Sequence, residues 1–207
     1  MSENLKFVLN AAAVVVIALV LIRLVFMETV LVQDNGMAPT LVYGDEVLVW
    51  KNANVDMADV VVCEHPVRTG GQVISRAIAF GGHTVRTDIN GMLFVDDDRT
   101  TTQPQTGMRF YDVTRKKLWD MQVFLIDYFG RHSHACFMQR GDRFQLRTYT
   151  VGKGVYLLGD NRSESGFDSR EFGEVDAERC IGQVFMRLRP APSRGDDLEL
   201  GYLEWIR

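Results

Sequence analysis

FVLNAAAVVVIALVLIRLVFM, residues 7–27, is an apolar run interrupted only by Asn10 and Arg23. A helix of this length spans the roughly 30 Å hydrocarbon core of a bilayer. A cleavable signal peptide has a shorter apolar stretch followed by small residues at a cleavage site, and the sequence after Met27 offers no such site. The run is therefore predicted to be an uncleaved transmembrane anchor, the alternative being a buried helix of a soluble protein.

The charges that flank the anchor predict its orientation. Lys6 and the α-amino group precede it, whereas no Lys or Arg lies between Arg23 and Lys51. The positive-inside rule then places residues 1–6 in the cytoplasm and residues 28–207 outside, in a periplasmic or extracellular space. One disulfide is possible in such an oxidising compartment, and all three pairings remain open among Cys63, Cys136 and Cys180.

Beyond the anchor, apolar residues recur in short runs or with a period of two, which predicts β-strands. The predicted strands are Glu46–Trp50, Asp59–Cys63, Val73–Phe80, Met121–Phe129, Phe144–Val151, Val155–Leu158 and Cys180–Leu188. Asn90-Gly91 predicts a hairpin, because both residues tolerate a positive φ. The polar segments Asp97–Gln105 and Pro190–Asp197 are predicted to be loops. The expected architecture is an all-β domain on one N-terminal transmembrane helix.

The composition excludes several classes of protein. Of the 207 residues, 46% are hydrophobic and 24% are charged, which excludes a disordered or collagen-like chain. The formal net charge of −4, without a basic run, argues against nucleic acid as a partner. Three cysteines are too few for a disulfide-dominated scaffold.

Four further segments, taken in order, resemble bacterial type I signal peptidases. They are DNGMAPTLVYGDEVLV (34–49), DVVVCEHP (59–66), VISRAIAFGGHTV (73–85) and VYLLGDNRSESGFDSREFG (155–173). The resemblance spans most of the chain except about residues 95–145, which are expected to be a family-variable insertion. It implies a membrane-anchored β-domain in the bacterial cytoplasmic membrane.

Members of that family cleave exported preproteins after a small-x-small signal with a serine nucleophile and a lysine base. The lysine must be neutral to accept a proton, so its site has to lower its pKa by burial. A second hydroxyl helps to hold the oxyanion, and another serine orients the lysine. The resemblance implies neither a cofactor nor a metal.

The two catalytic positions carry different residues in this chain. The nucleophile position, directly before Met37, is Gly36, which has no side chain to attack with. The base position, directly before Arg76, is Ser75, and a hydroxyl without an adjacent base does not accept protons near neutral pH. The chain is therefore predicted to be a catalytically inactive pseudoenzyme.

The supporting positions differ as well. The oxyanion position is Asp34, whose carboxylate would repel a developing negative charge. The orienting serine maps to Ser165 when counted from Arg162, but to Gly166 when counted back from Asp168, because one extra residue lies between them. The remaining motif residues are predicted to bind or to serve as scaffold: Met37, Pro39, Asp160, Arg162, Asp168, Ser169 and Arg170.

Two alternatives concern the histidines. Relocated catalysis would use a different serine and base, from the set Ser75, Ser133, His65, His83, His132 and His134. Alternatively, His132, His134 and Cys136 would share one face of a strand and offer three metal ligands, although no fourth is evident. Ordinary surface or half-buried residues are the default interpretation.

Three functions are compatible with this sequence. The first is a non-catalytic binder that holds preprotein, signal-peptide or pilin-like segments as added strands, as an assembly or chaperone-like factor. The second is a non-catalytic subunit of an active peptidase or secretion complex. The third is an active serine endopeptidase that processes signal peptides with relocated catalytic residues.

Overall fold

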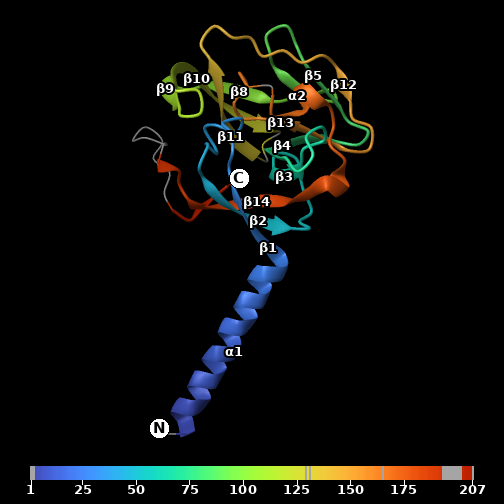
Figure 1. Cartoon of the computed structure of the whole chain (residues 1–207). Coiled ribbons are helices and arrows are strands. Elements are labelled where there is room, and N and C mark those ends of the chain that lie inside the picture. The colour runs from blue at the N-terminus through green and yellow to red at the C-terminus, as the bar shows by residue number, and fades with distance from the viewer. Residues whose placement is uncertain (1–2, 129, 131, 165, 193–201, 207) are drawn as a thin grey trace.

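A single apolar helix projects from a β-rich body in the computed structural model, which describes residues 3–128, 130, 132–164, 166–192 and 202–206 (Figure 1). The helix, α1 (Glu3–Phe26), is long and apolar enough to span a membrane, and the body buries none of that span. Strand β1 (Met27–Leu31) follows without a linker. The architecture confirms the prediction of an all-β domain on one N-terminal helix.

The largest sheet is antiparallel and runs in the order β1-β2-β14-β3-β4-β13, with β15 also paired to β14. Its further strands are β2 (Glu46–Lys51), β3 (Val60–Glu64), β4 (Gln72–Phe80), β13 (Val155–Leu158), β14 (Cys180–Arg189) and β15 (Glu204–Trp205). The runs that predict strands in this region all lie in the sheet. Its valine-rich strands pack with Met37 and Leu41, so the segment after β1 is part of the core.

Two four-stranded sheets complete the body, with orders β12-β5-β6-β7 and β11-β10-β8, where β9 also pairs with β10. Their strands are β5 (Thr84–Thr87), β6 (Leu93–Val95), β7 (Asp98–Arg99), β8 (Thr101–Pro104), β9 (Met108–Asp112), β10 (Lys117–Tyr128), β11 (His132–Gln139) and β12 (Tyr149–Thr150). Helix α2 (Ser169–Phe172) and the 3-10 helix η1 (Ala177–Arg179) are short.

Two predictions about local structure are wrong. Asp97–Gln105, predicted to be a loop, contains β7 and β8; most of their side chains are exposed, and backbone pairing with β6 and β10 needs no apolar pattern. Phe144–Val151, predicted to be a strand, contributes only β12. Phe144 instead packs over the Arg162 guanidinium, with 4.5 Å between Cζ and the ring centroid.

The hairpin predicted at Asn90-Gly91 is present between β5 and β6. Of the two residues, Gly91 alone takes a positive φ, of 79°. The Asp88 carboxylate accepts hydrogen bonds from the backbone N–H groups of Asn90 and Met92. The turn is therefore a longer loop, closed by an aspartate, rather than a two-residue turn.

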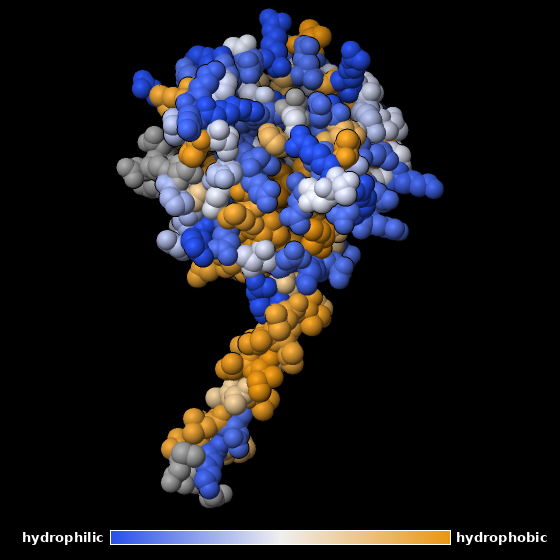
Figure 2. Space-filling model, viewed as in Figure 1, coloured by the Kyte–Doolittle hydropathy of each residue, from blue (hydrophilic) through white to orange (hydrophobic). Residues whose placement is uncertain are grey.

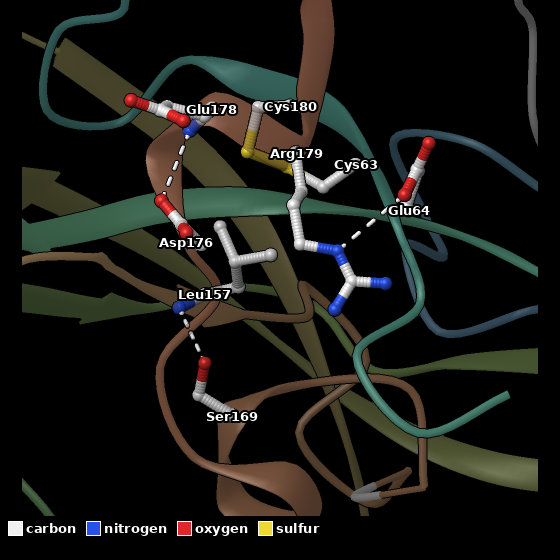
Figure 3. The surroundings of a disulfide bond; sticks show 8 residues. All are labelled: Cys63, Glu64, Leu157, Ser169, Asp176, Glu178, Arg179 and Cys180. Carbon is white, nitrogen blue, oxygen red and sulfur yellow. Dashed lines mark hydrogen bonds and ion pairs between the residues drawn. A yellow bond between two sulfur atoms is a disulfide. The ribbon is translucent and has the colours of Figure 1, made fainter. Parts of the chain in front are cut away.

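The disulfide joins Cys63 of β3 to Cys180 of β14, which lie directly opposite each other in the ladder (Figure 3). Beside it, Arg179 lies with its Nε 3.4 Å from a carboxylate oxygen of Glu64. Cys136 is buried and free. Of the three pairings that the sequence leaves open, the structure contains Cys63–Cys180.

Aromatic rings form a row where the helix enters the body. The centroid distances are 6.1 Å for Phe26–Trp50, 6.2 Å for Trp50–Phe185 and 5.7 Å for Phe185–Trp205. In Figure 2 the helix is apolar along most of its length, and apolar patches interspersed with polar residues lie on the part of the body nearest to it. This surface is suited to the membrane interface, where amphipathic rings are favoured.

Candidate functional site

Two segments far apart in the sequence meet at the candidate site. The carbonyl of Gly36 accepts a hydrogen bond of 2.9 Å from the N–H of Asn161, and the Asn161 side chain donates to the carbonyl of Asn35 at 3.1 Å. A Cβ on Gly159 would lie 2.5 Å from the Gly36 oxygen, so glycine is required for this approach. The loop after β1 and the loop after β13 are thereby held together.

Asp34 and Gly36 form a tight turn in the first of these loops. The N–H of Gly36 donates to Oδ1 of Asp34 at 2.8 Å, and Gly36 is buried. Burial raises the pKa of Asp34 above its ordinary value, against the smaller opposite effects of this hydrogen bond and of Arg68. The Asp34 carboxylate thus occupies the backbone donor that a ligand at this turn would otherwise use.

Ser75 lies on β4 and is fully buried. Its hydroxyl donates to the backbone carbonyl of Phe167 at 3.1 Å. Phe167 also fills the space above Gly36, because a Cβ on that glycine would lie 3.0 Å from the Cβ of Phe167 and 3.0 Å from Oδ1 of Asp34. Phe167 therefore brings together the positions expected for the nucleophile and the base.

Sequence reasoning does not identify Phe167 as a site residue. The available signal is the extra residue between Arg162 and Asp168, which lengthens the loop that carries Phe167. Neither length nor composition reveals where the added residue directs this side chain. Ser165, the expected orienting serine, lies outside the described residues, so its place relative to Ser75 stays a prediction.

A buried group of charges lies beside this centre. Arg76 makes two hydrogen bonds to the Asp160 carboxylate, Nε–Oδ1 at 2.9 Å and Nη2–Oδ2 at 2.7 Å. Asp160 also accepts from the Thr40 hydroxyl at 2.5 Å and lies 3.1 Å from Nε2 of His134. The charge of Arg76 and the hydrogen bonds from Arg76 and His134 hold the pKa of Asp160 far below its usual range, which outweighs the effect of its burial.

A second ion pair shapes the loop after β13. Asp168 caps α2 by accepting from the N–H of Arg170, and its carboxylate lies 2.7 Å from Nη2 of the same arginine. The N–H of Gly159 donates to Oδ2 of Asp168 at 2.9 Å, while the Ser169 hydroxyl accepts from the N–H of Leu157, as Figure 3 shows. These contacts fit the predicted scaffold role of Asp168, Ser169 and Arg170. Met37 and Pro39, which belong to the loop after β1, are buried.

Of the three residues expected to share one face of β11, only His134 and Cys136 lie in one group of possible metal ligands. His134, Cys136 and Asp160 offer donor atoms within 4.8 Å of one another, whereas His132 is not part of this group. Both oxygens of Asp160 bind Arg76, and a metal cation beside that guanidinium would be repelled. These residues do not fit a metal, so they are best described as part of the buried polar network.

The described residues contain no hydrogen bond between a serine hydroxyl and a histidine or lysine. His83 pairs with Asp96, and His65 accepts from the N–H groups of Val67 and Arg68. A serine nucleophile needs a base within hydrogen-bond reach. In the described part of the chain, the arrangement offers backbone and apolar contacts at Gly36 and Ser75 but no activated hydroxyl.

Comparisons with known proteins bear on the same segments. A family model described as "Signal peptidase, peptidase S26" matches residues 5–189. The chain is similar to Signal peptidase I of Streptococcus pneumoniae serotype 4 (strain ATCC BAA-334 / TIGR4), with 29% identity over 186 residues that cover 83% of this chain and 87% of the relative. Signal peptidase I of Streptococcus pneumoniae (strain ATCC BAA-255 / R6) is 28% identical over the same coverage.

Proposed function

The chain belongs to the signal peptidase family, peptidase S26, and we propose that it is a non-catalytic member that holds exported precursor segments instead of cleaving them. The observation that carries the proposal is the environment of Gly36 and Ser75. Neither residue supplies a nucleophile or a base. Phe167 lies 3.0 Å from where a Cβ on Gly36 would be, and its carbonyl accepts the hydrogen bond of the Ser75 hydroxyl.

Binding of an extended segment is supported by the edge of β4. The ladder with β13 ends at the pair Leu158↔Arg76, whereas β4 continues back to Gln72 alongside β3. Residues 72–75 of β4 therefore extend beyond the strand that pairs with the rest of it. Gln72 is exposed, whereas Val73, Ile74 and Ser75 are buried, so an added peptide strand would form backbone hydrogen bonds along this edge after displacing the segment that covers it.

We place the body outside the cytoplasm, with α1 as a single-pass anchor in the bacterial cytoplasmic membrane. The charge asymmetry at Lys6 supports this orientation. The disulfide between Cys63 and Cys180 supports it independently, because such bonds persist in oxidising compartments. A substrate or partner carrying a signal segment would meet the body at the outer membrane face.

The deciding experiment uses the full chain in lipid nanodiscs with a secretory preprotein that ends its signal in a small-x-small site. Cleavage is followed on gels, and binding is followed by crosslinking from a photoreactive residue at position 72. We expect saturable crosslinking without cleavage. An Ile74→Pro variant should lose the crosslink, because the Ile74 N–H points away from β3 and proline cannot donate to an added strand; a Val67→Pro variant, in an exposed loop outside β4, is the control.

Placing a serine and a lysine at the two expected catalytic positions tests the same site from the opposite direction. Gly36→Ser with Ser75→Lys is expected to stay inactive, whereas adding Phe167→Gly should permit some cleavage. Cleavage by the natural protein that disappears on changing one serine or histidine would establish the active-peptidase alternative. Absence of precursor binding, with co-purification of an active peptidase from native membranes, would instead establish the partner-subunit function.

A further inference from the structure

A cavity lies in the body away from Gly36 and Ser75, between the loop after β11 and strands of the two smaller sheets. Its volume is about 520 Å³, within the roughly 300–1,000 Å³ of small-molecule sites. Its apolar lining includes Leu93, Phe124, Ile126, Met138 and Phe144. Such a lining favours a hydrocarbon or aromatic occupant.

Arg162 also lines this cavity and is only 7% exposed. Its Nη2 donates to the Tyr128 hydroxyl at 3.3 Å, and its Nε is buried without a hydrogen-bond partner. No carboxylate of the described residues lies within ion-pair distance of this guanidinium. Arg162 is therefore a buried cation whose hydrogen-bonding capacity is incompletely used.

The groups around Arg162 do not neutralise it. Asp160 is engaged by Arg76 through both of its oxygens. Burial, followed by the charge of Arg76, lowers the pKa of His134 to about 4, so that imidazole is neutral at pH 7. Burial raises the pKa of the Cys136 thiol to about 11, so it is neutral too. This buried group carries one uncompensated positive charge, which an anion entering the cavity would neutralise.

We propose that the cavity binds a small amphiphile of the fatty-acid type, with its single carboxylate at Arg162 and its hydrocarbon tail against the apolar lining. The planar guanidinium matches a carboxylate and offers the Nε–H as a donor. Asp142 and Arg143 also border the cavity with opposite charges, so Arg162 is the buried charge that an anionic headgroup would meet. This site does not involve the β4 edge, so it goes beyond the proposed function and stands or falls separately from precursor binding.

The test is calorimetric titration of the full chain in nanodiscs with octanoate, after subtraction of empty nanodiscs. Octanol and octylamine serve as ligands with the same tail and a different head. We expect one saturable octanoate site and at least about tenfold weaker binding of the other two, since a hydrogen bond to a charged group contributes roughly 1.5–3 kcal/mol. Octanol or octylamine binding as tightly as octanoate would overturn the proposal.

Two variants locate the site. Met138→Trp should fill the cavity and abolish octanoate binding, whereas Met108→Trp, on β9 and outside the lining, should leave it unchanged. Arg162→Gln should reduce octanoate affinity to that of octanol; if this variant does not fold, the ligand series and Met138→Trp still decide. Undiminished binding by folded Met138→Trp, or no saturable binding by the natural protein, would refute the site.

Discussion

The polar frame of the site (Arg76, His134, Asp160, Asp168 and Arg170) and its centre (Asp34, Gly36, Ser75 and Phe167) are built on different principles. Each charge of the frame is buried or half-buried against a partner, as in the bidentate contact between Arg76 and Asp160. The centre is held by one hydroxyl–carbonyl bond, one short turn and apolar contact. Removing one partner from the pair Arg76–Asp160 or Arg170–Asp168 leaves a buried or half-buried charge, whereas the centre tolerates change.

Under the proposed non-catalytic function, this difference would account for a family frame that persists around Gly36 and Ser75. Removing one partner of a buried ion pair costs far more than replacing both with a well-packed apolar pair. A serine or lysine at the centre carries no such structural obligation once its reaction is not needed. The residues of the frame are therefore constrained by the fold of the family, whereas those of the centre are constrained by the chemistry.

The largest expected effect comes from breaking the frame at its middle. Asp160→Asn should lower the free energy of unfolding by about 3–5 kcal/mol, because it leaves Arg76 buried without its carboxylate. Chemical denaturation of the natural protein and the variant in nanodiscs measures this. Asp120→Asn, which removes an ion pair with Arg140 at the exposed surface, should cost less than about 1 kcal/mol. Equal costs for the two variants would show that burial does not distinguish the frame.

Lowering the pH should destabilise the folded protein through protonation of His134 in the frame. Its pKa is lowered to about 4 in the folded protein, against an ordinary value of 6.5. The unfolded chain therefore binds the proton first, and stability should fall by roughly 3 kcal/mol as the pH drops from about 6.5 to about 4. In His134→Gln this part of the loss should be absent, whereas His132→Gln should retain it. Parallel pH profiles for the natural protein and His134→Gln would contradict the expectation.

A substitution at the centre should lower the free energy of unfolding by less, and truncating Phe167 should reduce that cost. Gly36→Ala should cost roughly 1–3 kcal/mol, because the added Cβ meets Phe167 and Asp34 at 3.0 Å. In a Phe167→Gly background the same substitution should cost clearly less, and a double-mutant cycle measures the coupling. Gly166→Ala, in the same loop with nothing within 4 Å of an added Cβ, is the matched control. Additive costs would show that Phe167 does not occupy this space.

Asp34→Asn should produce the smallest effect, a stabilisation below about 1 kcal/mol at pH 7. Burial raises the pKa of Asp34, so the ionised form is disfavoured in the folded protein. The advantage of asparagine should be absent below the ordinary value of 3.8 and should grow as the pH rises above it. Unfolding measured at pH 4 and pH 7 checks the sign; a destabilised variant at pH 7 would show that the carboxylate is needed.

The sequence predicts the fold where side-chain pattern and backbone pairing agree. The apolar run of α1, which is long enough to span a membrane, and the strands of the main sheet, whose apolar side chains face the core, satisfy this condition. The edge strand β8 does not, since its exposed polar residues are held by backbone bonds to β10. The pattern of Phe144–Val151 predicts a strand, but most of this segment does not pair. Phe144 packs against the Arg162 guanidinium instead of continuing a strand.

The candidate site is predictable in part. Motif spacing identifies Gly36 and Ser75 as positions of interest, and the structure joins both to Phe167. The role of Phe167 depends on the path of a lengthened loop, which no local propensity determines. The choice of Cys63 and Cys180 likewise depends on β3 lying beside β14, a pairing between strands more than a hundred residues apart.

That cross-link closes a loop with a sequence separation of 117 residues, which contains the cavity, both smaller sheets and Ser75 and Phe167 of the site, whereas Asp34 and Gly36 precede it. A protease that cuts once in any turn between Cys63 and Cys180 would separate the chain into two pieces that remain covalently joined. The distal piece would then stay attached to the fragment that bears the helix α1. Release of the body from α1 would require either a cut between α1 and Cys63, or a cut within the loop together with reduction of this one bond.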